Sequence, residues 1–171
     1  MKIRPYVVYV VVLFLVWFTA SCAKEVDAPT TASTPVPTPA SNITAEDVGK
    51  LKWIEGTWRG IDGDKPFFER YRLEGTTLIV EGFADEKLSS VSDTSRFELR
   101  DGAFGKFEGD GGSRASSITA DSVQFVPAKP GTGNMFRFER PTPNGWRAVL
   151  EWPATDDKPA RQKIYNMEAV K

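Results

Sequence analysis

The chain has 171 residues, with 22 lysine and arginine residues against 23 aspartate and glutamate residues, a single cysteine and no histidine. It has no basic stripe interleaved with aromatic residues, so we expect no binding to nucleic acid. The lack of histidine excludes Ser-His-Asp and Cys-His catalytic sites and zinc sites built from histidine and cysteine. We therefore expect no metal, no cofactor and no enzyme activity.

The first 21 residues have the order of a signal peptide. Lys2 and Arg4 precede an uninterrupted apolar run of 13 residues, Tyr6 to Phe18, and small or polar residues follow. This run is shorter than the roughly 20 apolar residues that a membrane-spanning helix needs. We therefore predict that the protein is exported and that residues 1–21 are removed.

The sequence Thr19-Ala20-Ser21-Cys22 resembles the lipobox of bacterial lipoproteins, although Thr19 departs from the large aliphatic residue usual at that position. The resemblance implies cleavage before Cys22 and lipidation of its sulfur, which would anchor the protein to a membrane without a spanning helix. Ala23 resembles the outer-membrane sorting pattern, which implies a location in the cell envelope, at the outer membrane facing the periplasm. The alternative is ordinary secretory cleavage, which would leave an unpaired thiol near the mature N-terminus.

A disordered tether is expected over residues 22–43. The part from Lys24 to Ser41 has four prolines and many threonine, serine and alanine residues. Such a segment stays extended and offers little to a core, because proline fixes φ and lacks a hydrogen-bond donor. The remaining residues, 44–171, have the size of one domain with one core.

A short helix is predicted at the start of this domain. Thr44 and Asp47 have the spacing of a capping box, in which each residue bonds the backbone of the other. Val48 and Leu51 are spaced to face one side of the helix. The pattern then changes to the alternation that is typical of strands.

Short segments rich in aromatic and β-branched residues make up the rest of the domain. We predict strands at residues 67–73, 76–83, 95–100, 122–128, 134–140, 146–152 and 162–170. Turn residues separate them, and Asn144-Gly145 is the strongest hairpin signal. About eight to ten strands at this spacing predict an all-β fold, either an antiparallel up-and-down barrel or a sandwich.

The sequence GTW at residues 56–58 favours the barrel, because it resembles the GxW signature on the first strand of lipocalins and their calycin-type relatives. The sequence ERY at residues 69–71 resembles a step on the second strand of small uncharacterised lipocalin-like domains of bacteria. The resemblance covers roughly residues 48–170. It implies that Trp58 closes one end of the barrel, where a large indole can plug a tapering interior.

Residues 56–63, GTWRGIDG, also resemble the opening of nitrobindin-type haem barrels. In those barrels a histidine near the C-terminal end of the chain holds the haem iron. This chain has no histidine, so the resemblance supports a barrel and argues against haem.

Alternation gives each strand two faces, and apolar content decides which face we place inside the barrel. The candidate ligand-binding residues of the interior are Trp58, Glu69, Tyr71, Phe83, Phe136, Phe138, Trp152 and Tyr165. A carboxylate inside a barrel is costly unless it is paired. We therefore expect Glu69 to meet an arginine or a hydroxyl group, with Arg147, Arg161 and Tyr165 as the candidate partners.

Together these features predict a membrane-anchored, lipocalin-like lipoprotein that binds a small, partly apolar molecule in the cell envelope. The alternative is a filled barrel that acts as an envelope interaction or structural module, because small barrels can be filled by their own side chains. A third reading is an envelope enzyme that uses paired carboxylates such as Asp85-Glu86, which we instead place in a solvated loop. A connected apolar cavity of several hundred Å³ would favour ligand binding over the filled barrel.

Overall fold

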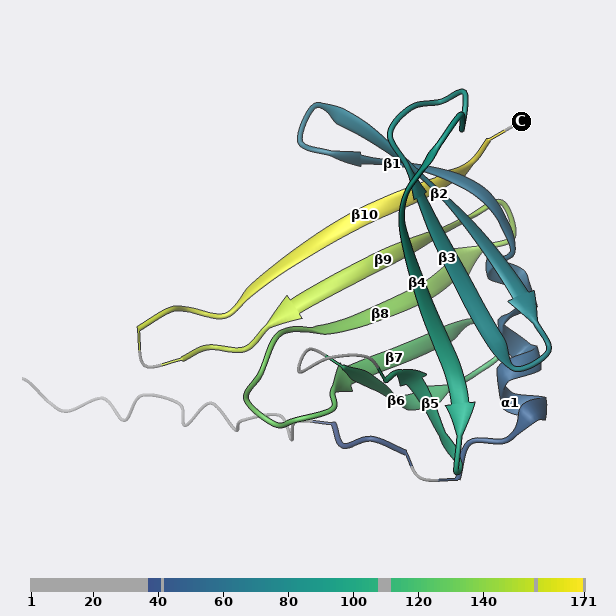
Figure 1. The fold of residues 1–171 in the computed structure, drawn as a ribbon. Coiled ribbons are helices and arrows are strands. Elements are labelled where there is room, and N and C mark those ends of the chain that lie inside the picture. Colours follow the sequence, from purple (N-terminus) through teal and green to yellow (C-terminus); the bar gives the residue numbers. More distant parts are fainter. Residues whose placement is uncertain (1–36, 41, 108–111, 156, 171) are drawn as a thin grey trace, which may run out of the picture. The chain divides into compact units, whose positions relative to one another are not determined.

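The computed structural model describes residues 37–40, 42–107, 112–155 and 157–170. The predicted signal peptide, Cys22 and the first part of the tether lie outside the described residues. Ten antiparallel strands form a closed barrel in which each strand pairs with the next and β1 pairs with β10 (Figure 1). The strands are β1 (Gly56–Asp62), β2 (Lys65–Glu74), β3 (Thr77–Phe83), β4 (Val91–Arg100), β5 (Ala103–Lys106), β6 (Ser113–Ile118), β7 (Ser122–Pro127), β8 (Met135–Thr142), β9 (Gly145–Trp152) and β10 (Arg161–Ala169).

This architecture confirms the prediction of an all-β, antiparallel, up-and-down barrel preceded by a short helix. The predicted hairpin at Asn144-Gly145 is confirmed, since Thr142 and Gly145 are paired across the turn between β8 and β9. Two strands, β5 and β6, were not predicted.

The helix before the barrel consists of α1 (Ala45–Gly49) followed by the 3-10 helix η1 (Lys50–Ile54). The predicted capping box is confirmed. The Thr44 hydroxyl accepts a hydrogen bond from the Asp47 amide at 3.2 Å, and the Thr44 amide donates to the Asp47 carboxylate at 3.0 Å. Hydrogen bonds from Lys50 and from Thr44 lower the pKa of Asp47 to about 2. In the part of the chain that the structure describes, no helix is long and apolar enough to cross a membrane.

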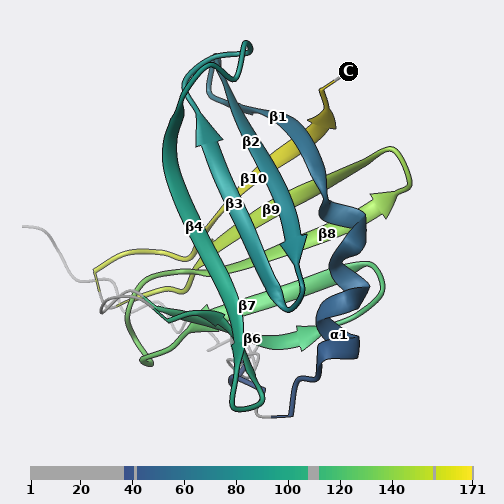
Figure 2. The same ribbon diagram turned by 45° about the vertical axis from the view of Figure 1, so that its right-hand side comes forward.

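The helices cover one end of the barrel, which we term the closed end. Because the strands run alternately up and down, this end also holds the turns that connect β2 to β3, β4 to β5, β6 to β7 and β8 to β9 (Figure 2). Val48, Leu51 and Ile54 point into the barrel and are fully buried. The opposite end, which we term the open end, holds the loops that connect β1 to β2, β3 to β4, β7 to β8 and β9 to β10.

The chain joins the barrel earlier than predicted. Ile43 is buried in the core, and its amide donates to the carbonyl of Gly102 at 2.8 Å. Ala40 packs against the same core, and its amide donates to the carbonyl of Ala115 at 2.9 Å. A domain boundary at residue 44 is therefore too late, because residues assigned to the tether satisfy backbone groups of the barrel.

Apolar residues on the outer face of the barrel lie beneath arginine side chains. Ile79 is paired in register with Arg72 on one side and Arg96 on the other, and only 2% of its surface is exposed. Val149 lies beside Arg137 and is 1% exposed. The methylene stems of these arginines cover apolar surface while their charged groups reach water.

Candidate ligand-binding cavity

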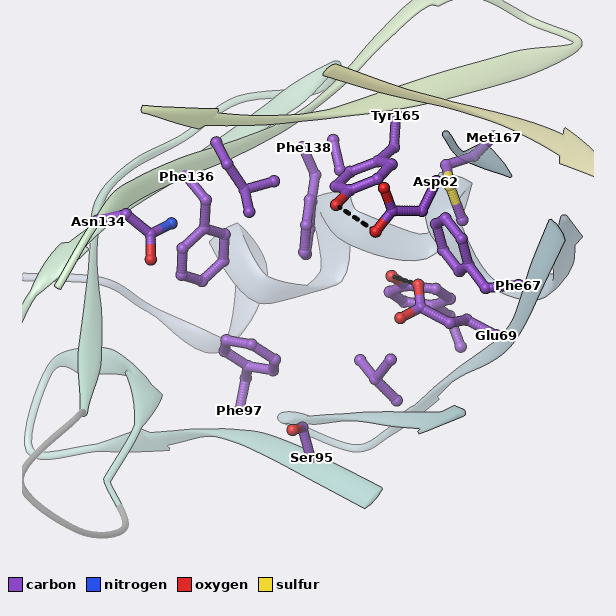
Figure 3. A pocket seen from close by; sticks show the side chains of 14 residues that line it. Asp62, Phe67, Glu69, Ser95, Phe97, Asn134, Phe136, Phe138, Tyr165 and Met167 are labelled. Atoms are coloured by element: carbon purple, nitrogen blue, oxygen red, sulfur yellow. Dashed lines mark hydrogen bonds between the residues drawn. The ribbon is translucent and has the colours of Figure 1, made fainter. Parts of the chain in front are cut away.

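A cavity of about 500 Å³ occupies the barrel interior between the aromatic cluster of the closed end and the open end (Figure 3). Strands β1, β2, β3, β4, β8, β9 and β10 all contribute side chains to its wall. Burial increases with depth. Asp62 is exposed, Phe67 and Tyr165 are half-buried, and Tyr71 and Met167 are buried.

Aromatic rings in edge-on or tilted contact form much of the wall. The centroids of Phe67 and Tyr165 lie 5.3 Å apart, and those of Phe136 and Phe138 lie 5.5 Å apart. Gly60 makes room for this arrangement, because a Cβ at that position would come within 2.3 Å of the Phe67 ring. The absence of a side chain on β1 therefore lets the Phe67 ring lie against the wall.

Trp58 and Trp146 form the core of the closed end. The Trp58 indole donates to the carbonyl of Ile54 at 2.7 Å, and its ring lies 6.0 Å from the Trp146 ring in an edge-on arrangement. Trp146 in turn lies 5.2 Å from the Tyr71 ring, which lines the cavity. The indole nitrogens of Trp146 and Trp53 are the buried side-chain polar atoms without an acceptor among the described residues.

Glu69 points into the cavity from β2. The hydroxyl of Tyr71 donates to its carboxylate at 2.7 Å. Burial raises the pKa of Glu69, the hydrogen bond from Tyr71 acts in the opposite direction, and the charge of Asp93 adds to the rise. Burial also raises the pKa of Tyr71 well above its usual value, so its hydroxyl remains a donor.

The expected partner class for Glu69 is thus right, but the named partners are wrong. A hydroxyl meets the carboxylate, and it belongs to Tyr71 rather than Tyr165. Arg147 forms an ion pair with Glu139 on the outer face. Arg161 lies over the Trp152 ring at 4.3 Å.

An ion pair spans β1 and β10 at the mouth of the cavity. The ammonium of Lys163 lies 2.5 Å from the carboxylate of Asp62, and the Tyr165 hydroxyl donates to the same carboxylate at 3.3 Å. The hydrogen bond from Lys163 lowers the pKa of Asp62. The ladder between these strands pairs Trp58 with Ala169 and Arg59 with Glu168, and next to it the Val170 amide donates to the carbonyl of Thr57 at 2.9 Å. Side chains therefore hold the two strands together beyond the ladder.

A side branch of about 260 Å³ adjoins the cavity towards β5 and β6. It shares Ser95, Phe97, Asn134 and Phe136 with the main cavity. The ammonium of Lys106 lies in this branch and donates to the Ser95 hydroxyl at 3.0 Å. Lys106 is the one lysine of the described residues that is not exposed.

The structure brings together five of the eight predicted interior residues around the cavity. These are Glu69, Tyr71, Phe136, Phe138 and Tyr165. Trp58 is buried in the closed end and does not line the cavity.

Phe83 and Trp152 do not line the cavity. Phe83 lies on the outer face, because the guanidinium of Arg70 covers its ring at 4.9 Å and the register shifts between Gly82 and Phe83. Trp152 lies at the end of β9, where its ring is covered by Arg161 and lines a separate shallow pocket. Cys22 lies outside the described residues.

Sequence reasoning missed the polar residues of the cavity, Asp62, Ser95, Lys106 and Asn134. Lys106 was detectable in principle. The Asp101-Gly102 turn fixes the register of β4 and β5, and alternation from Phe104 then places Lys106 on the inward face. Within the described part of the chain, no group of three or more histidine, cysteine, aspartate or glutamate residues is arranged to hold a metal ion.

No protein-family model matches this chain, and no curated protein matches it. The structure therefore shows the closed barrel, and no family assignment accompanies it. Its resemblance to lipocalins and the resemblance of its leader to those of lipoproteins remain predictions from short motifs.

Proposed function

We propose that this protein binds a small, partly apolar molecule inside its barrel. The observation that carries the proposal is the cavity of about 500 Å³, which lies within the range of small-molecule sites. Six of its 14 lining residues are aromatic and four are polar or charged, a combination that is common for sites that orient a ligand with one polar end. The filled-barrel alternative has less support, because side chains leave this volume unoccupied.

Binding of a neutral fluorescent probe, N-phenyl-1-naphthylamine, tests this proposal in the full chain. Ala148 lines the cavity from β9 and is 8% exposed, so Ala148→Phe places a ring in the binding volume. We expect this variant to lower probe affinity at least tenfold. The matched control is Ala84→Phe, because Ala84 is exposed in the loop after β3.

Retained affinity in Ala148→Phe, with an unchanged circular dichroism spectrum, would contradict the proposed site. Mass spectrometry of protein extracted gently from its own host offers an independent readout. A stoichiometric small molecule that is lost in Ala148→Phe would support the proposal.

We further propose that the barrel is a lipoprotein anchored through Cys22 in the cell envelope, at the outer membrane and facing the periplasm. The support is the signal-peptide order of residues 1–21 and the likeness of residues 19–22 to a lipobox. Cys22→Ser should move the protein from the detergent-extracted membrane fraction to the fraction released without detergent. Unchanged membrane association would contradict the anchor and leave the cavity proposal untouched.

A further inference from the structure

The Glu69 carboxylate lies in the cavity without an opposite charge beside it. Among the described residues it forms no ion pair, and its hydrogen-bond partner is the neutral hydroxyl of Tyr71 at 2.7 Å. By contrast, Glu81 and Glu139 on the outer face each pair with two arginines. The neighbouring charge that acts on Glu69 is that of Asp93, another carboxylate.

Aromatic rings flank this carboxylate. Phe67 and Tyr71 are its neighbours on the inward face of β2, and the ring of Tyr165 lies edge-on to Phe67 at 5.3 Å. Figure 3 shows Glu69 beside Phe67 on one side of the cavity, with Phe136 and Asn134 on the other. The face of an aromatic ring carries negative charge density and attracts cations, most strongly where water is excluded.

We propose that the ligand carries a cationic amine, bound by the Glu69 carboxylate and the rings beside it. The apolar body of the ligand would then lie against Phe97 and Phe136, further along the cavity. This inference rests on the proposed function of the cavity as a binding site. It gives that ligand a charge and an orientation.

The charges of the cavity agree with this orientation. A half-buried carboxylate without a counter-ion is costly, and a ligand cation at hydrogen-bond distance offsets that cost. Lys106, the positive group of the side branch, donates to the Ser95 hydroxyl on β4 and would repel a second cation there. The amine is therefore best placed at the Glu69 end.

Three probes with the same ten-carbon chain test the inference by calorimetry: decylammonium, decan-1-ol and decanoate. The full chain carries Cys22→Ser, so that no attached acyl chain competes for the cavity. We expect decylammonium to bind about tenfold more tightly than decan-1-ol, as for one charge-assisted hydrogen bond, and decanoate to bind more weakly than the alcohol.

Glu69→Gln keeps an acceptor for Tyr71 and removes the charge. We expect it to lower decylammonium affinity to that of decan-1-ol, while the affinity for decan-1-ol changes less than about twofold. The matched control is Glu86→Gln, which makes the same change in an exposed loop and should leave all three affinities unchanged.

The other outcomes show whether the inference alone is wrong or the proposed function is wrong as well. Equal binding of decylammonium and decan-1-ol, or an ammonium preference that survives Glu69→Gln, would contradict the inference and leave a ligand site. Tightest binding of decanoate would contradict it as well and would point to Lys106. Failure of all three probes to bind would contradict the proposed function and the inference together.

Discussion

The two ends of the barrel use the same alternation of side chains for different purposes. At the closed end, Leu51 and Ile54 from the helix cover the interior, and 8% of the Trp58 surface is exposed. At the open end, Phe136 and Tyr165 are only half-buried and surround a cavity. No helix covers this end among the described residues, so inward-facing aromatic side chains remain available to a ligand. The comparison separates residues that stabilise the barrel from residues that can bind.

The largest effect that the comparison predicts is for tryptophan residues at the two ends. Trp58→Ala should lower the free energy of unfolding by about 3 to 5 kcal/mol, because it leaves a cavity in the closed end and removes the hydrogen bond to Ile54. Trp152→Ala should cost less than about 1.5 kcal/mol, because its ring lies half-buried under Arg161. Urea titration of the full chain measures both. Similar urea midpoints for the two variants would mean that the tryptophan of the closed end does not stabilise the barrel more than the tryptophan of the open end.

A smaller effect is expected for the cap of the helix that covers the closed end. Thr44→Ala removes the capping box and should cost about 1 kcal/mol. Thr132→Ala is the control in an open-end loop, where the Thr132 hydroxyl donates to the carbonyl of Lys129 at 2.7 Å. We expect the control to change stability by less than about 0.5 kcal/mol in the same titration. A cost for Thr132→Ala as large as that for Thr44→Ala would mean that the closed end is not the more stable one.

The smallest effect concerns the carboxylate of the cavity and depends on pH. Burial and the charge of Asp93 raise the pKa of Glu69 above its ordinary value of 4.5. The folded protein therefore binds this proton more tightly than the unfolded chain, and stability falls as the pH rises from 4.5 through the folded-state pKa. Glu69→Gln should remove this loss, so at pH 7 the variant should be more stable than the wild type by about 1 kcal/mol or less.

Glu81→Gln on the outer face provides a control of opposite sign. Partial burial alone would raise the pKa of Glu81, but hydrogen bonds and charges from Arg70 and Arg72 lower it overall. Its ionised form therefore stabilises the fold above the ordinary pKa, and that stability is lost as the pH falls through the lowered value. As the pH rises from 3 to 7, the urea midpoint measured relative to that of the wild type should rise for Glu69→Gln and fall for Glu81→Gln. Movement in the same direction would contradict the placement of Glu69 in a cavity without counter-charge.

The fold was largely predictable because most strands carry strong alternation and clear turns. β5 and β6 were missed for physical reasons. β5 has four residues, too few for a pattern, and β6 has the sequence SRASSI, whose small polar side chains carry little hydrophobic signal. Gly105 on β5 also obscures the strand. It is required there because a Cβ would meet the Ser113 carbonyl oxygen at 2.0 Å.

The site was predictable where apolar content separates the two faces of a strand. It does so on β8, where Phe136 and Phe138 oppose Arg137, and both rings line the cavity. It fails on β3, because Ile79 and Phe83 are as apolar as the inward residues and are buried on the outer face by arginine stems. Burial by neighbouring charged residues depends on register across strands, which a single strand does not reveal.

The short ladder between β1 and β10 has a consequence for the order of folding. Every other strand pair joins neighbours in the sequence, whereas this pair joins the first strand to the last through Trp58 with Ala169 and Arg59 with Glu168. Such a closure carries the largest loss of chain entropy and gains only a few backbone hydrogen bonds. We therefore expect the hairpins to assemble before the seam closes. During refolding, the amides of β1 and β10 at this seam should therefore become protected from exchange with solvent deuterium after the amides of the hairpins.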